Sequence, residues 1–243
     1  MSIAYTHRRF NQTKDYGDLL FYAPLDEPSY LQPTFAKDGN YNILDINILQ
    51  PYPPHNIPYT FFNTLDYCIW ETFIPTNLPA YTLNCWIVPT TKANYTFGLF
   101  NLSSNKPSNR LSLQNYIDIP YGVGANIREM RLRYTNYNIG AGNEIVVSDS
   151  FHNSEINNCL ISMVITGNPG NTFCNFYING VYHGIPFGVG ESFIYPHPCI
   201  GDVVFKNNQT LEGNYSHFSI YGKAMTQQEI LNLYYNGGVP PEI

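Results

Sequence analysis

Paired carboxylates are the side chains that would give this 243-residue chain hydrolytic chemistry. A retaining glycosidase needs two carboxyl groups about 5 Å apart, and an inverting one needs about 6.5–9.5 Å. The acidic residues around the strand-like segments, Glu71, Glu129, Glu144 and Glu155, are isolated from one another. We therefore predict a protein that is not an enzyme and has no catalytic residues, with pairing through space left open at this stage.

The histidine and cysteine residues do not predict a catalytic or metal site any more strongly than the carboxylates do. None of the six histidines forms an i, i+4 pair on a helix or a legible Ser/His/Asp grouping, so each is predicted to be solvated or hydrogen-bonded in a structural role. The five cysteines include no Cys-x-x-Cys pair, which argues against zinc. Four of them stand in apolar, strand-like surroundings, which predicts buried free thiols and a reducing compartment.

Tyrosines in segments expected to be loops are the candidates for ligand binding. Tyr52, Tyr59, Tyr134 and Tyr137 could stack on sugars and form a glycan platform. Tyrosine is also enriched at protein–protein interfaces, and we favour that interpretation over the glycan platform. Both remain open in the sequence.

The composition restricts the class of protein. Charged residues make up 12% of the chain, against about 25% in a typical domain. They are replaced by uncharged polar and aromatic residues, including 29 Asn, 21 Tyr and 15 Phe, which favour strands and turns. The net charge of −6 argues against a nucleic-acid partner. No apolar run is long enough to span a membrane, and the first residues do not resemble a secretory signal.

Short strand-like segments separated by Gly, Asn and Pro follow one another along most of the chain, which is typical of a sandwich or barrel. The segments expected to be strands are 19–25, 43–49, 67–73, 81–88, 96–102, 110–114, 127–134, 144–147, 159–166, 172–178, 181–184, 199–205 and 215–221. Two similar stretches, Tyr121-Gly-Val-Gly124 and Phe187-Gly-Val-Gly190, are expected to be loop corners.

Two short motifs predict local structure more specifically than the strand pattern does. Asn179-Gly180 between strand-like segments predicts a hairpin with a type I′ turn, whose two central positions need positive φ. Thr226 followed by Glu229 predicts a capping box at the start of a short helix, which Gly237 and Gly238 would end. This is the one segment with a helical pattern.

Four landmarks in order resemble laminin-G-like domains of the concanavalin A-like lectin/glucanase superfamily. They are Leu20-Phe-Tyr-Ala-Pro-Leu25, Tyr81-Thr-Leu-Asn-Cys-Trp86, Phe176-Tyr-Ile-Asn-Gly180 and the stretch from Phe218 to Gly237. The resemblance implies an all-β, two-sheet antiparallel jelly-roll sandwich with one short C-terminal helix. We expect an N-terminal arm at 1–17, the jelly-roll domain at 18–238 and a tail at 239–243.

The resemblance also implies where a catalytic site or a calcium site would lie. Glucanases of this superfamily carry a Glu-x-Asp-x-x-Glu strand, which this chain lacks. Calcium is the usual ion of these domains, and Asp38-Gly39-Asn40 matches their acidic loop, so Asp38 and Asn40 are the candidate ligands. Near the last strand, Ser216 and His217 stand where a carboxylate is expected, which weakens the calcium site. The favoured alternative for Asp38 and Asn40 is a simple turn, without metal or other cofactor.

Two functions fit these observations. The first is a non-enzymatic structural component of a virus or phage particle, such as a capsid-associated, decoration or tail protein. The Asn/Tyr/Ile-rich composition is what an AT-rich genome would give, and an ordered N-terminal arm would lie on a neighbouring subunit. The expected partners are then virion subunits or copies of itself, in a virion assembled in the host cytoplasm. The alternative is a carbohydrate-binding, lectin-like module for adhesion or host recognition.

Overall fold

A computed structural model shows how the chain folds. The structure describes residues 16–25, 31, 33–47, 60–62, 67–75, 78–89, 96–98, 100–103, 110–116, 129–135, 144–146, 151–152, 158–168, 171–183, 187–189, 197–200 and 213–241. Most of the predicted arm therefore lies outside the described residues. Within them, the strands pair antiparallel, and no helix is long and apolar enough to cross a membrane.

One layer is a nine-stranded sheet whose main path runs β15-β14-β13-β6-β18-β1-β2, with β16 paired to β14 and β4 paired to β18. Its strands are β1 (Leu19–Ala23), β2 (Phe35–Ala36), β4 (Thr60–Phe62), β6 (Ala80–Pro89), β13 (Cys159–Asn168), β14 (Asn171–Ile178), β15 (Val181–Tyr182), β16 (Phe187–Val189) and β18 (Gly213–Tyr221).

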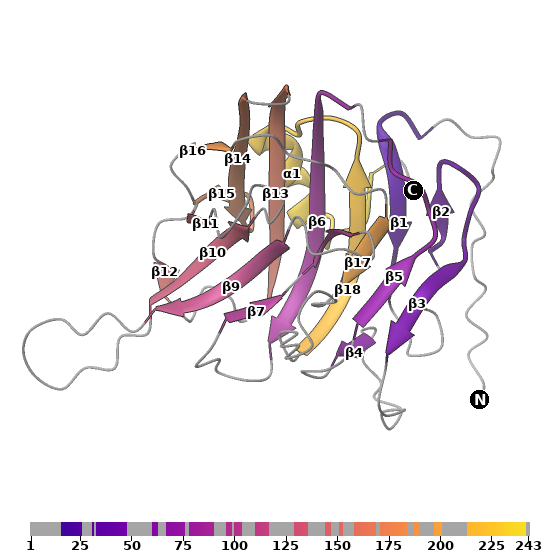
Figure 1. The fold of residues 1–243 in the computed structure, drawn as a ribbon, viewed down its shortest axis with the longest axis horizontal. Helices are drawn as coiled ribbons and strands as arrows, with labels where there is room; N and C mark the ends of the chain where they lie inside the picture. The colour runs from indigo at the N-terminus through magenta and orange to yellow at the C-terminus, as the bar shows by residue number, and fades with distance from the viewer. Residues whose placement is uncertain are drawn as a thin grey trace, which may run out of the picture.

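Two smaller sheets form the other layer. A five-stranded sheet contains β7 (Thr96–Gly98), β9 (Arg110–Tyr116), β10 (Glu129–Thr135), β11 (Glu144–Val146) and β12 (Phe151–His152). A four-stranded sheet contains β3 (Ile43–Asn47), β5 (Tyr67–Trp70), β8 (Phe100–Ser103) and β17 (His197–Ile200). They lie side by side in front of the nine-stranded sheet in Figure 1, and their strands cross it obliquely. The two-layer sandwich with one short helix is as predicted.

The main core lies between the layers. Successive side chains of a strand point to opposite faces, and in β6 the residues Tyr81, Leu83, Cys85 and Ile87 face this core. Trp70 of β5 is fully buried there, with its ring centroid 5.2 Å from that of Phe21 and 5.7 Å from that of Phe218. The strand alternation thus supplies one apolar face to each layer.

A second apolar cluster covers the opposite face of the nine-stranded sheet, which we call the helix-side face. The helix α1 (Gln227–Tyr235) lies behind β13 and β14 in Figure 1. Its buried residues Ile230 and Leu233 pack with Leu160 and Val164 of β13. Tyr16 is buried in the same cluster, so the described fold takes in the end of the segment predicted to be an arm.

Several local predictions need correction. Phe187–Val189 is strand β16, not a loop corner, because it pairs with the edge of β14. The single strand predicted over 96–102 is two strands, β7 and β8, which belong to different sheets. The short strands β2, β4 and β12 were not predicted, because two or three residues are too few to show an alternating pattern.

Cysteine burial was predicted correctly. All five cysteines are free and buried. Burial raises the pKa of the Cys159 thiol to about 12 and that of Cys174 further still. These thiols are therefore protonated and behave as small apolar side chains.

Candidate functional site

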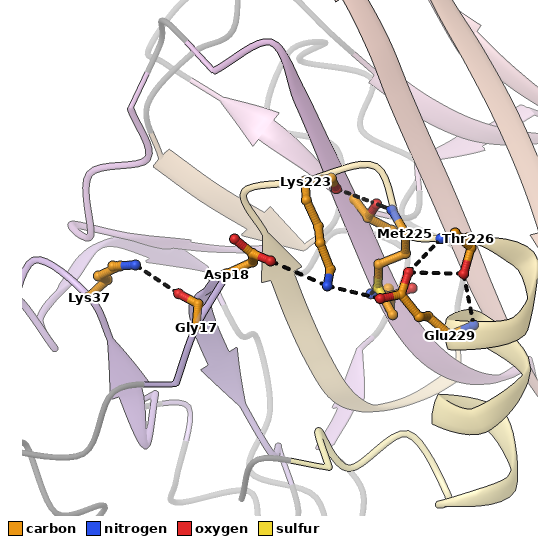
Figure 2. Close-up of polar contacts among 9 residues, drawn as sticks. Gly17, Asp18, Lys37, Lys223, Met225, Thr226 and Glu229 are labelled. Atoms are coloured by element: carbon orange, nitrogen blue, oxygen red, sulfur yellow. Dashed lines mark hydrogen bonds and ion pairs between the residues drawn. The ribbon is translucent and has the colours of Figure 1, made fainter.

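Hydrogen bonds and ion pairs at the start of α1 hold the helix against the helix-side face of the sheet. The Thr226 hydroxyl accepts a hydrogen bond from the Glu229 amide, and the Glu229 carboxylate accepts one from the Thr226 amide at 2.7 Å, which completes the predicted capping box. Lys223 lies between the carboxylates of Asp18 and Glu229, at 3.3 and 2.9 Å (Figure 2). Lys37 reaches the Gly17 carbonyl nearby. These contacts fix the helix to the start of β1.

The β14–β15 hairpin is held against the same helix. Its turn residues Asn179 and Gly180 have φ of 53° and 78°, as a type I′ turn requires. The Asn179 side chain accepts a hydrogen bond from the Leu160 amide at 2.9 Å. Gln227 of α1 donates to the Gly180 carbonyl, and Leu231 lies so close to Gly180 that a Cβ there would be 2.7 Å from its Cδ1. The hairpin and the helix therefore form one rigid corner.

This corner carries a row of aromatic side chains at one edge of the nine-stranded sheet. Phe173, Asn175 and Tyr177 alternate along β14 on the helix-side face, since Cys174, Phe176 and Ile178 face the core. Tyr182 of β15 lies opposite Tyr177, with ring centroids 5.5 Å apart. Phe173 is 37% exposed and Tyr182 38% exposed. We call Phe173, Asn175, Tyr177 and Tyr182 the aromatic platform.

The polar groups of the platform are neutral. The Tyr182 hydroxyl donates to the Asn175 amide oxygen at 3.4 Å. Burial, and then the neighbouring Tyr182, raise the pKa of the Tyr177 phenol. Gly188 is the residue of β16 paired with Phe173. The platform thus offers ring faces, hydroxyls and one amide without charge, which suits stacking and hydrogen bonding rather than proton transfer.

A second aromatic group borders α1. The rings of Trp86 and Tyr234 stack with centroids 5.6 Å apart and planes 3° apart, and the Trp86 indole N–H donates to the Asn158 side chain. Tyr235, next to this pair, is 75% exposed. This group anchors the helix and leaves one tyrosine ring at the surface.

The predicted calcium ligands form a turn. Gly39 has φ of 76°, and the two Asp38 carboxylate oxygens accept hydrogen bonds from the Asn40 amide at 3.0 Å and the Phe73 amide at 2.7 Å. The Asn40 side chain accepts from the Asn42 amide. Among the described side chains, no group of three or more His, Cys, Asp or Glu is placed to hold a metal. Asp38 and Asn40 therefore work as turn residues here, and a calcium site there stays an untested prediction.

The predicted ligand-binding tyrosines are not brought together by the described part of the chain. Tyr52, Tyr59 and Tyr137 lie outside the described residues. Tyr134 is on strand β10, paired with Leu111 and Ile145; this confirms the predicted strand 127–134 and corrects the grouping of Tyr134 with the loop tyrosines. The aromatic platform was missed because ligand candidates were sought among tyrosines expected in loops, whereas its residues were predicted to form a hairpin. The signal was present, since β14 carries aromatic side chains at both odd and even positions and only one set can face the core.

The histidine predictions hold where the structure describes them. His217 sits at a bulge of β18 with φ of 52°, and its Nδ1 lies 2.9 Å from the Tyr22 hydroxyl. Its amide donates to the Pro24 carbonyl. His197 Nδ1 lies 3.3 Å from the Thr72 carbonyl oxygen. Both are hydrogen-bonded, as expected for structural histidines.

No family model and no curated protein matches this chain. Its structure is similar to solved structures with low sequence identity. The receptor binding domain of botulinum neurotoxin D has a TM-score of 0.56 at 13% identity, covering 90% of this chain and 53% of that one. The binding domain of Paraclostridial Mosquitocidal Protein 1 has a TM-score of 0.56 at 17% identity, with 91% and 53% coverage. The sialidase of Trypanosoma rangeli has a TM-score of 0.55 at 12% identity, with 90% and 33% coverage.

These similarities show the fold, a β-sandwich. The chain spans about half the length of the toxin domains it matches, or less in the case of the sialidase. The class of fold is thus established, and function has to be argued from the aromatic platform.

Proposed function

We propose that this chain is a carbohydrate-binding, lectin-like module that holds a glycan on the aromatic platform. The observation that carries the proposal is the row of Phe173, Asn175 and Tyr177 with Tyr182 beside it, on a rigid corner and partly open to solvent. The narrower assignment to the laminin-G-like branch rests on the four landmarks in the sequence and is part of this proposal.

The chemistry of the platform fits a sugar. Ring faces can pack on the C–H faces of a pyranose, while the Asn175 amide and the tyrosine hydroxyls can bond its hydroxyl groups. Residues two apart on a strand are about 6.6 Å apart, so Phe173 and Tyr177 are about 13 Å apart along β14. That length suits a short oligosaccharide lying along the strand.

The comparisons support a binding role in general terms. Several of the similar structures are receptor binding or binding domains by name, and one is a complex with rat synaptotagmin II. A binding domain that recognises a protein is therefore the natural competitor to the glycan proposal. The two are separated by the experiment below.

The proposal includes the absence of catalysis. Every carboxylate whose side chain the structure describes is held by a protein partner: Asp18 by Lys223, Asp38 by two amides, Glu71 by Asn42, and Glu229 by the cap and Lys223. Carboxylates held in this way are structural, and this favours binding over hydrolysis. Turnover of a polysaccharide, lost on replacing one carboxylate, would contradict it.

A place for this module on a virus or phage particle, with virion subunits or further copies as partners and the virion as its location, stays a prediction. Mass spectrometry of purified particles would test it. Nothing in the described residues favours the particle role over another setting.

A glycan array tests the proposal. The wild-type chain should bind a defined set of glycans, and Tyr182→Ala and Phe173→Ala should each lose that binding. Val181→Ala is the matched control, because Val181 is 55% exposed on the same strand as Tyr182 but pairs with core-facing Ile178. Absence of any array hit, or equal binding by all variants, would refute the platform as a glycan site.

A further inference from the structure

Small polar residues, rather than apolar ones, occupy the centre of the helix-side face beneath α1. Asn84, Ser162, Ser216 and Ser219 are each fully buried. Ser162 on β13 pairs with Asn84 on β6, and Asn84 pairs with Ser219 on β18, so these three form a row across the sheet. Ser216 lies in the adjoining row, opposite Trp86.

The polar atoms of this cluster are only partly satisfied. The Asn84 amide nitrogen donates to the Ser219 hydroxyl at 3.3 Å and faces the Met225 sulfur at 3.7 Å. The Asn84 amide oxygen and the hydroxyls of Ser162 and Ser216 have no hydrogen-bond partner among the described residues. Three unsatisfied side-chain groups thus lie on three adjacent strands, under one helix.

The surroundings make this arrangement costly unless something else bonds to these atoms. Leu160 and Val164 lie on either side of Ser162 along β13, and Ile230 and Leu233 on α1 pack in the same cluster. Thr82, beside Asn84 on β6, is buried too, but its hydroxyl bonds the Lys223 carbonyl and the Met225 amide. A buried polar group without a hydrogen-bond partner destabilises a fold, because it loses its bonds to water and gains none in return. Three such groups together would take away a large part of the stability of a typical domain.

We infer that ordered water binds on the helix-side face of the sheet and hydrogen-bonds the buried polar atoms of Asn84, Ser162 and Ser216, bridging Asn84 and Ser162, which are paired across β6 and β13. Water suits the site because it both donates and accepts: it can donate to the Asn84 amide oxygen and exchange hydrogen bonds with the serine hydroxyls. Buried waters with about three protein partners are a regular part of globular structures.

The site acts as a hydrated layer under the helix, independent of any glycan on the platform. It explains why an otherwise apolar helix-docking surface carries serine and asparagine at its centre. It also predicts that the hydroxyls of Ser162 and Ser216 contribute to stability, which unpartnered hydroxyls would not.

A high-resolution crystal structure of the whole chain tests this directly. The expected result is electron density for water within hydrogen-bonding distance of at least two of the three atoms. In parallel, Ser162→Ala and Ser216→Ala should each raise the unfolding equilibrium constant about fivefold, the effect of one lost buried hydrogen bond. Ser219→Ala removes the hydrogen-bond partner of the Asn84 amide nitrogen, so it measures the effect of losing one buried hydrogen bond that the structure shows. The inference would be overturned if the crystal structure showed no water near any of the three atoms. It would also be overturned if the alanine variants were as stable as the wild type or more stable.

Discussion

The close approach of α1 to the hairpin makes Gly180→Ala the sharpest test of how the platform is positioned. Gly180 has φ of +78°, and a Cβ there would lie 2.7 Å from Leu231 Cδ1 and 2.9 Å from Leu231 Cα. Gly39 has nearly the same φ, +76°, but a Cβ there meets nothing within 4 Å. The two glycines thus differ in space and not in backbone conformation.

The magnitudes follow from that difference. A left-handed conformation costs an alanine about 1–2 kcal/mol, which both variants share. Forcing a methyl group into a packed region adds about 1–3 kcal/mol, which only Gly180→Ala incurs, because backbone as well as side chain stands in the way. We expect a loss of about 2–5 kcal/mol for Gly180→Ala and about 1–2 kcal/mol for Gly39→Ala.

Urea unfolding followed by fluorescence gives both values. Adding Leu231→Ala to Gly180→Ala should recover part of the loss, since the clash with the leucine side chain disappears while the clash with the helix backbone stays. Gly180→Ala should also weaken glycan binding, because the hairpin that carries Tyr177 and Tyr182 must move. Equal losses for Gly180→Ala and Gly39→Ala, within about 0.5 kcal/mol, would refute the close packing of hairpin on helix.

The remaining predictions concern the cap, the ion pairs and the thiols. Thr226→Ala should lower the free energy of unfolding by about 0.5–2 kcal/mol, measured against exposed Gln228→Ala as control. Burial opposes ionisation of Glu229, but the Thr226 and Lys223 contacts outweigh it and lower its pKa below 4.5. Its contribution to stability is therefore complete above about pH 4.5 and is lost as the pH falls through the lowered pKa, as acid titration of the melting temperature should show. Glu229→Gln should remove this dependence. All five thiols should resist alkylation until the chain unfolds, because all five are buried and burial also raises the pKa of Cys85, Cys159 and Cys174; rapid labelling of the native protein at neutral pH would contradict the buried assignment.

Much of the architecture is readable from the sequence because it rests on local rules. Thr226 and Glu229 define the helix start through hydrogen bonds three residues apart, and Asn179-Gly180 defines the hairpin through backbone conformation alone. The alternation in β6 and β13 indicates one core-facing set of side chains. These features involve neighbours in the chain, so no knowledge of the fold is needed to see them.

The hairpin that brings Tyr177 and Tyr182 together is readable in the same way, but the exposure of the candidate site is not, since it depends on how a distant segment, α1, packs. Tyr177 and Tyr182 meet only because the hairpin closes, and their exposure depends on where α1 lies. Tyr134 was grouped with loop tyrosines although it ends the predicted strand 127–134, and pairing with β9 and β11 places it inside a strand. Asp38 resembled a metal ligand because a turn and a calcium loop share the same residue types.

The central claim is that a glycan lies on Phe173, Asn175, Tyr177 and Tyr182. Titrating the isotope-labelled chain with the best glycan from the array, followed by NMR, tests it most directly. The account predicts that the largest shifts fall on the backbone and ring signals of β14 and β15, with Tyr182→Ala abolishing them. Shifts confined to other segments, or none with any glycan, would contradict it.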